Sequence, residues 1–159
     1  MKIDFIGLVN KMDAVLDKKK ERLKMLFFLS MQQRELFAVE CIDRLIENLQ
    51  QKQICIDEID CLDTEFARYT SELENCMEYY SDSSHFESVI NAKLQHLRDE
   101  DVEIKRLIHQ IQEVDSENHK MAAELKTHLL QSMKSSAREK KAYTSYGSSQ
   151  ILSIAEDKG

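Results

Sequence analysis

Four cysteines are the residues of this chain most able to do chemistry, and their spacing does not favour a metal site. They are Cys41, Cys55, Cys61 and Cys76. No two of them form a CxxC pair, whereas the thiolate ligands of zinc usually come in closely spaced pairs. Cys41, Cys55 and Cys76 share one heptad position, so on one helix they point the same way but stand too far apart to form disulfides. We expect free thiols that act as small core residues, with Cys61 on the opposite side of the helix.

The histidines and the paired carboxylates likewise predict no catalytic centre. The five histidines include no HExxH motif and no pair four residues apart, the spacing that would bind a metal ion from one helix face. Acidic pairs such as Asp57 with Asp60 would need a concave site, which long slender helices rarely supply. Three scattered glycines cannot form a phosphate-binding loop. We expect no enzymatic activity, no cofactor and no metal ion.

The composition predicts an all-α fold. The 159 residues include no proline, no tryptophan and only three glycines, which favours almost uninterrupted helix. No run of alternating β-branched residues is bounded by turn residues, so strand signals are absent. We predict an elongated antiparallel bundle of about three long helices with coiled-coil-like packing, formed by residues 1–137.

The longest hydrophobic ladder, residues 38–80, organises the predicted bundle. Apolar residues recur there at alternating three- and four-residue steps, as in the seam of a coiled coil. The predicted seam is Ala38, Ile42, Leu45, Leu49, Ile56, Ile59, Phe66, Leu73, Met77 and Tyr80, interrupted by Lys52, Asp63 and Thr70. A second stripe beside it contains Cys41, Cys55, Leu62, Tyr69 and Cys76 and is broken by Asn48. Two adjacent apolar stripes predict that this helix contacts two neighbouring helices.

A helix is also expected before this ladder. It begins near Ile3, and its seam is interrupted only by Lys19, whose aliphatic stem can lie along the apolar face. The predicted seam residues are Phe5, Val9, Met12, Leu16, Leu23 and Leu26. We place a turn within residues 35–43, although one continuous helix over residues 3–80 also fits the pattern.

The third predicted helix follows a polar turn at residues 81–84. Glu87 stands three residues after Ser84 and forms a capping box with it. Asp115 and Asn118 interrupt the seam of this helix. A buried polar pair there can set the register of the helices, or the helix can bend at that point.

The net charge of −7 is concentrated in the middle of the chain. Residues 41–80 carry 3 basic and 10 acidic side chains, and residues 81–133 carry 6 and 10. Helices of this charge repel phosphate, so nucleic acid is not an expected partner. No segment approaches the ~20 apolar residues of a membrane span, and the first ten residues contain no secretory signal. We expect a cytoplasmic protein that does not insert into membranes.

The periodicity fails after about residue 137, and we predict a flexible C-terminal tail over residues 138–159. This segment is basic at first and then rich in Ser, Tyr and Gly, so it cannot bury enough apolar surface to offset its ordering entropy. Tyr143 and Tyr146 expose large rings there without an obvious reason. They either fold back onto the bundle or dock on a partner.

Three segments carry a resemblance to a known family. They are Asn48–Asp63 (NLQQKQICIDEIDCLD), Ile108–Asn118 (IHQIQEVDSEN) and Lys140–Tyr146 (KKAYTSY). In this order and spacing they resemble the flagellar export chaperones of the FlgN type, especially those of Gram-positive bacteria, over most of residues 5–146. Cys41 departs from the pattern, since a small or charged turn residue is expected there.

The resemblance implies a cytoplasmic, all-helical chaperone of flagellar type III export. Such a protein holds the C-terminal amphipathic helices of hook–filament junction proteins (hook-associated proteins) and delivers them to the export gate. Both flanks of the third seam are apolar, so we expect a client groove. It is formed by Met121, Leu125, Leu129, Leu130 and Met133. Tails of such chaperones engage the export gate, which makes Tyr143 and Tyr146 the expected docking residues.

A second class of function fits the same periodicity. A coiled-coil structural or adaptor protein that forms a homo-oligomer and has no export role would close its apolar seam by symmetric pairing. The chaperone interpretation is also compatible with a homodimer. An exposed apolar face on the third helix favours the chaperone, and a face closed between two copies favours the scaffold.

Overall fold

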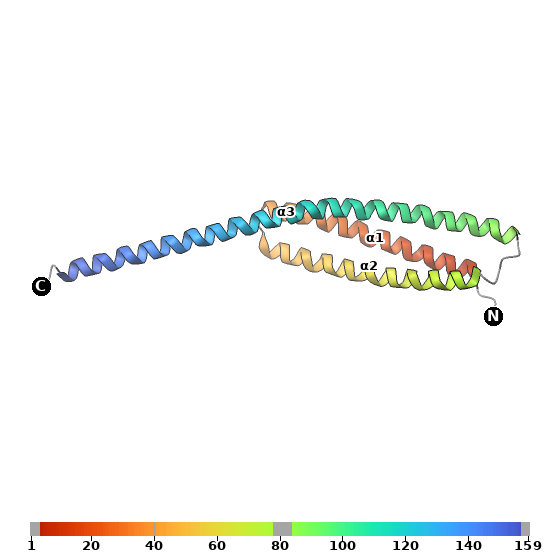
Figure 1. The fold of residues 1–159 in the computed structure, drawn as a ribbon, viewed down its shortest axis with the longest axis horizontal. Helices are drawn as coiled ribbons and strands as arrows, with labels where there is room; N and C mark the ends of the chain where they lie inside the picture. The colour runs from red at the N-terminus through yellow and green to blue at the C-terminus, as the bar shows by residue number, and fades with distance from the viewer. Residues whose placement is uncertain (1–3, 40, 78–83, 157–159) are drawn as a thin grey trace. The chain divides into compact units, whose positions relative to one another are not determined.

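The computed structural model is all-α over the part of the chain that it describes, residues 4–39, 41–77 and 84–156. The helices are α1 (Phe5–Ala38), α2 (Ile42–Met77) and α3 (Ser84–Glu156). The chain divides into two compact units, Met1–Asn118 and His119–Gly159. In the first unit the three helices lie side by side, and α2 runs antiparallel to its neighbours (Figure 1). The predicted all-α bundle of three long helices is confirmed, and its predicted extent over residues 1–137 stays a prediction.

The turn predicted within residues 35–43 is also confirmed, and one continuous helix over residues 3–80 is wrong. α1 ends at Ala38, and the backbone N–H of Cys41 bonds back to the carbonyl of Leu36 at 3.2 Å. At its other end α1 is capped by Asp4, whose Oδ1 accepts a hydrogen bond from the backbone N–H of Gly7 at 2.9 Å.

The second predicted turn lies mostly outside the described residues. α2 ends at Met77 and α3 begins at Ser84, so the seam residue Tyr80 and the side chain of Ser84 are not described. Residues 138–156 form the last part of α3. The flexibility that we expect for residues 138–159 stays a prediction.

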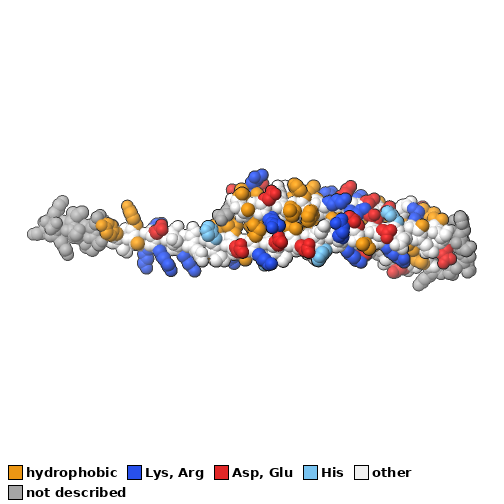
Figure 2. Space-filling model, turned by 90° about the horizontal axis from the view of Figure 1, so that it is seen from above, with side chains coloured by type: hydrophobic (Ala, Val, Ile, Leu, Met, Phe, Trp, Pro, Cys, Tyr) orange, Lys and Arg blue, Asp and Glu red, His pale blue; other side chains and the backbone are white. Residues whose placement is uncertain are grey.

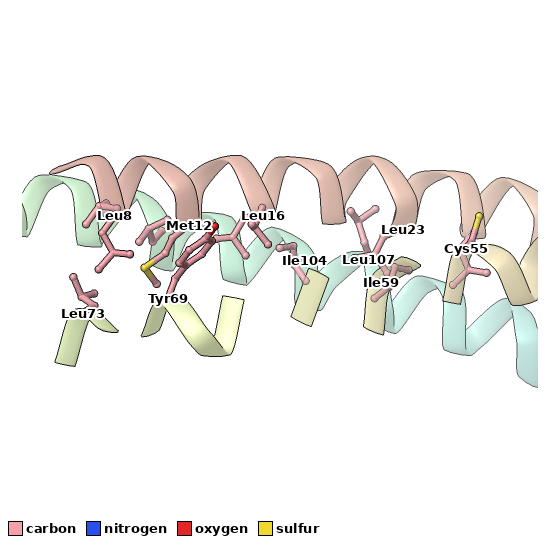
Figure 3. Close-up of a cluster of buried hydrophobic side chains, with 14 of the residues drawn as sticks. Leu8, Met12, Leu16, Leu23, Cys55, Ile59, Tyr69, Leu73, Ile104 and Leu107 are labelled. Carbon is pink, nitrogen blue, oxygen red and sulfur yellow. The ribbon is translucent and has the colours of Figure 1, made fainter. Parts of the chain in front are cut away.

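The core of the first unit is formed by side chains from all three helices. Figure 3 shows Leu16 and Leu23 of α1 pointing toward the same interior as Ile59 of α2 and Ile104 of α3. The apolar residues predicted for the first seam are buried: Phe5, Val9, Met12, Leu16, Leu23 and Leu26. Lys19, which interrupts that seam, is mostly buried and forms an ion pair with Asp63 of α2. Its stem can therefore lie along the apolar face while its charge reaches a carboxylate.

The register predicted for α2 is half wrong. One heptad row of the predicted seam is buried or half-buried, from Leu45 through Ile59 to Leu73, but the other row is exposed. The exposed apolar members of that row are Ile42, Leu49, Ile56 and Met77. Ala38, which shares the row of Leu45, is exposed too, and it belongs to the end of α1. The stripe of Asn48, Cys55, Leu62, Tyr69 and Cys76 takes the place of the exposed row, so Lys52 and Asn48 belong to the core rather than interrupting it. Both choices keep the three- and four-residue steps, and side-chain hydrophobicity alone favours the wrong one.

A buried polar layer crosses the bundle where these unexpected core residues lie. Lys52 Nζ of α2 donates to Gln33 Oε1 of α1 at 3.0 Å and to Asp115 Oδ1 of α3 at 2.6 Å. Asn118 Nδ2 donates to the backbone carbonyl of Ser30 at 2.8 Å and to Gln33 Oε1 at 3.2 Å. All three helices are therefore joined at one level by charged or amide groups. Of the two alternatives predicted for Asp115 and Asn118, the buried polar pair is the one that the structure has.

Asn48 extends the polar layer between α1 and α2. Its Nδ2 donates to the backbone carbonyl of Leu29 at 3.0 Å and to Gln32 Oε1 at 3.1 Å. Among the described residues, Oδ1 of Asn48, Oδ1 of Asn118 and Oγ of Ser30 are buried without a hydrogen-bond partner from the protein. Such atoms cost stability, so the layer contributes more to the alignment of the helices than to the free energy of folding.

Ion pairs at the surface of the first unit join the same helices. Arg34 of α1 bonds to Glu117 of α3 at 2.9 Å. The half-buried Lys20 of α1 pairs with Asp17 of its own helix and with the half-buried Glu100 of α3, and its hydrogen bond with Glu100 is the main cause of its raised pKa. Exposed pairs contribute little each, typically about 0–1 kcal/mol, so they support an alignment that the core decides.

Ile56 and Ile59 test the register of α2, because the sequence pattern places both in the seam and the structure buries only one. Ile59 is 9% exposed and Ile56 is 37% exposed. Ile59→Ala should lower the free energy of unfolding by ~2–5 kcal/mol, since it removes buried methyl groups and leaves a cavity. Ile56→Ala, the same chemical change, should cost less than about 1 kcal/mol. Urea unfolding followed by circular dichroism measures both, and equal losses would contradict the register.

Candidate functional site

The second unit carries the apolar residues predicted for a client groove. Met121, Leu125, Leu129 and Met133 follow one another at four-residue steps, so they form one ridge along the helix. Leu130 lies beside this ridge, three residues before Met133. Met121 and Leu125 are half-buried, whereas Leu129, Leu130 and Met133 are between 41% and 68% exposed. The ridge therefore offers its last turns to solvent.

This ridge can bind an apolar surface but carries no group suited to bond chemistry. A helix of amphipathic sequence can pack its own apolar stripe against such a ridge. Methionine at both ends, Met121 and Met133, lets the ridge adapt to partners of different shape because the thioether side chain is flexible and polarisable.

Tyr143 and Tyr146 lie further along the same helix and are both strongly exposed. They are three residues apart, so the two rings stand on one side of the helix. An exposed pair of amphipathic rings is typical of a contact surface. Their predicted role in docking stays a prediction.

The first unit has a groove between α1 and α2 that we did not predict from the sequence. Met25 of α1 and Ile54 of α2 line it, together with the exposed Cys61 and the half-buried Leu62. Figure 2 shows hydrophobic side chains gathered among charged ones on one face of this unit. Met25 and Ile54 lie outside the seams of their helices, and two such isolated residues are a weak signal until the fold brings them together.

The cysteines occupy different environments. Cys55 and Cys76 are buried, Cys41 is half-buried and Cys61 is exposed. Burial raises the pKa of the Cys55 thiol, and the nearby carboxylate of Glu58 raises it further. Over the described residues, no three His, Cys, Asp or Glu side chains are grouped so that they could hold a metal ion.

None of the helices, over their described residues, is long and apolar enough to cross a lipid bilayer. The structure thus presents a long helical bundle with a polar layer in its core and an exposed apolar ridge on a separate unit.

A comparison with models of protein families identifies the family of this chain. The model of the family described as FlgN protein matches residues 1–151. The chain belongs to the FlgN family. No curated protein and no solved structure matches it significantly.

Membership of the FlgN family makes this chain a flagellar export chaperone and confirms the predicted resemblance. The family match covers the whole first unit and, in the second unit, both the apolar ridge and the two tyrosines. It covers as well the α1–α2 groove of the FlgN bundle.

The cysteines give a test of the FlgN core. In the native protein we expect Cys61 to react first with a thiol reagent such as Ellman's reagent, and Cys55 and Cys76 last, because buried thiols are protected. The raised pKa of Cys55 means that less of it is thiolate at a given pH, so its labelling should keep increasing to higher pH than that of an ordinary thiol.

Peptide mapping by mass spectrometry measures the order of labelling. All four cysteines should react at similar rates in denaturant, which serves as the control, and Cys61→Ser should remove the fast phase. Native labelling of Cys55 as fast as that of Cys61 would show that this part of the core is open.

Proposed function

We propose that this FlgN chaperone works in the cytoplasm and holds the C-terminal amphipathic helix of hook-associated proteins on the ridge from Met121 to Met133. It then delivers them to the export gate. The observation that carries the proposal is the exposure of Leu129, Leu130 and Met133 on one helix. Among the described residues of the second unit there is no second helix that could cover them.

The dimensions of the ridge suit a short helix. From Met121 to Met133 it extends over ~18 Å, about three helical turns at ~1.5 Å per residue. A client helix with apolar residues at three- and four-residue steps could lie along the ridge, so that its own apolar stripe and the ridge bury each other.

The expected strength of this contact is modest. Covering the exposed part of Leu129, Leu130 and Met133 stabilises a complex by about 1–2 kcal/mol for each residue, at ~25 cal/mol per Å². Association itself costs at least about 4 kcal/mol. These three residues alone therefore give weak binding, and the half-buried Met121 and Leu125 must contribute as well. A weak hold suits a chaperone that must release its client.

The ridge is tested by the affinity of FlgN for synthetic C-terminal helices of hook-associated proteins, measured by isothermal titration calorimetry. Leu129→Asp and Met133→Asp should each weaken binding by about tenfold or more, because a carboxylate in an apolar contact loses its hydration. Val102→Asp, an exposed apolar residue of α3 in the first unit, is the matched control and should bind normally. Helicity and melting temperature should be unchanged in all three variants.

An unchanged affinity of Leu129→Asp for every hook-associated helix would remove the ridge from the client site. A fall in helicity would call for the milder Leu129→Ser, which leaves less charge on the helix.

Delivery is tested separately, through Tyr143 and Tyr146. Deleting residues 142–159 should leave the melting temperature and client affinity unchanged and abolish secretion of the client, if this segment docks on the export gate. Tyr143→Ala and Tyr146→Ala then identify which ring matters, with Tyr→Phe at the same position as a control that keeps the ring. If deletion lowers the melting temperature instead, the tyrosines pack on the bundle; normal secretion by the deletion variant would end the docking hypothesis.

A further inference from the structure

The groove between α1 and α2 has an apolar floor that the bundle itself does not bury. Two adjoining hollows share Arg22, Ile54 and Glu58 and so form one groove, whose larger part has a volume of about 600 Å³. On its floor Met25 is 47% exposed and Ile54 is 59% exposed. Apolar surface of this kind is stabilised when it is covered, so the groove favours an apolar occupant.

The rim of the groove on α2 is acidic. Glu58 is paired across the groove with Arg22 of α1, at 2.9 Å between Oε2 and Nε. Asp57 accepts a hydrogen bond from the neutral side chain of Gln53 at 2.8 Å, and Glu65 accepts one from the hydroxyl of Tyr69 at 2.9 Å. Neither carboxylate has an ion pair among the described residues, and the charged side chains that line the larger hollow are two basic and four acidic: Lys18, Arg22, Glu21, Asp57, Glu58 and Glu65. The rim therefore favours an occupant with basic side chains along one edge.

The helix over residues 119–147 has the complementary chemistry. It carries six basic and two acidic side chains, a net charge of +4, whereas residues 1–118 carry 15 basic and 25 acidic side chains, a net charge of −10. Lys134, Arg138 and Lys141 follow at steps of four and three residues and so share one side of the helix. Leu130 precedes Lys134 by one turn, and Met133 lies beside it, so apolar and basic residues form adjoining stripes.

We propose that the α1–α2 groove binds the helix over residues 119–147 of a second copy of this chain. Leu130 and Met133 of that copy cover Met25 and Ile54, and its basic stripe lies along Asp57 on the α2 rim. A second copy is favoured over the same chain because α3 contains neither proline nor glycine between Ser84 and Tyr146, so its sequence supplies no break at which the helix turns back.

Each copy offers both surfaces, one acidic groove and one basic helix. Two copies can therefore exchange two identical contacts around a two-fold axis, which closes the assembly at a dimer. The proposal shares Leu130 and Met133 with the proposed client ridge, so a client helix and a second copy would compete for them. The groove and its rim belong to the first unit, so Asp57→Lys and Ile54→Asp test the dimer without changing the ridge.

Sedimentation equilibrium of the full-length chain at several protein concentrations tests whether it forms the dimer. At low ionic strength the mass should rise with concentration from 18.6 kDa toward twice that value. Added salt should weaken the dimer, because it screens the attraction between exposed charges within about 10 Å at 0.1 M. Peptides that represent clients are absent from this experiment, so its outcome is independent of client binding.

Charge reversal tests the surfaces. Asp57→Lys should raise the dimer dissociation constant by about fivefold or more, since it replaces an attraction by a repulsion. Asp99→Lys is the matched control: Asp99 is an exposed residue of α3 outside the groove and accepts a hydrogen bond from Gln95 four residues earlier, as Asp57 does from Gln53. Adding Lys134→Glu to Asp57→Lys should bring the dissociation constant back toward the original value, because the two changes together form a new pair of opposite charges.

Two results would overturn the proposal. A mass of 18.6 kDa at every concentration up to the solubility limit would show that no second copy binds. A dimer that Asp57→Lys and Ile54→Asp leave intact, but that Leu129→Asp dissociates, would show that the ridges of two copies pair with each other instead. A variant that loses client binding but keeps the dimer, or one that loses the dimer but still binds the client, would distinguish this proposal from the client site.

Discussion

The hydrogen bonds of Lys52 decide how the three helices of the first unit align. Its ammonium group reaches Gln33 of α1 and Asp115 of α3 from a core position of α2, and Asn118 shares the same amide oxygen of Gln33. Sliding α2 along its neighbours by one helical turn would place this ammonium group against apolar side chains. Each buried polar group left without a partner costs roughly 1–3 kcal/mol, so the alternative alignments are disfavoured even though their apolar steps fit as well.

The same alignment determines what remains outside. Because Asn48, Lys52 and Cys55 occupy the core of α2, the more hydrophobic Leu49, Ile54 and Ile56 are left at its surface. A bundle that only maximised burial would choose the opposite row. The polar layer thus keeps apolar surface available for contacts with other proteins, which a chaperone needs and an isolated structural rod does not.

The two units carry net charges of opposite sign. The first unit is strongly acidic and the helix over residues 119–147 is basic, and each carries exposed apolar residues between its charges. Apolar contact supplies the affinity of such surfaces, while charge mainly sets the orientation and the rate of association. In both of our proposals, for the ridge with Leu129 and Met133 and for the groove with Met25 and Ile54, the partner is an amphipathic helix whose charges set its orientation.

The sequence by itself determined the helical fold, the turn near residue 40 and the buried seam of α1, because proline and glycine are scarce and the apolar residues keep a helical period. It also singled out Asp115 and Asn118 as a polar interruption and Leu129 and Met133 as part of an apolar face. The segments Asn48–Asp63, Ile108–Asn118 and Lys140–Tyr146 sufficed to suggest the FlgN family, which the family match confirms.

Only the tertiary structure decided which row of α2 is buried. Hydrophobicity ranks Ile56 above Cys55 and Leu49 above Lys52, and a single helix has no means of preferring the polar row. That preference arises only when Gln33 and Asp115, far away in the chain, supply the oxygens that Lys52 needs. The α1–α2 groove also depends on tertiary packing. Met25 and Ile54 lie outside the seams of their own helices, and they form one surface because the two helices lie side by side.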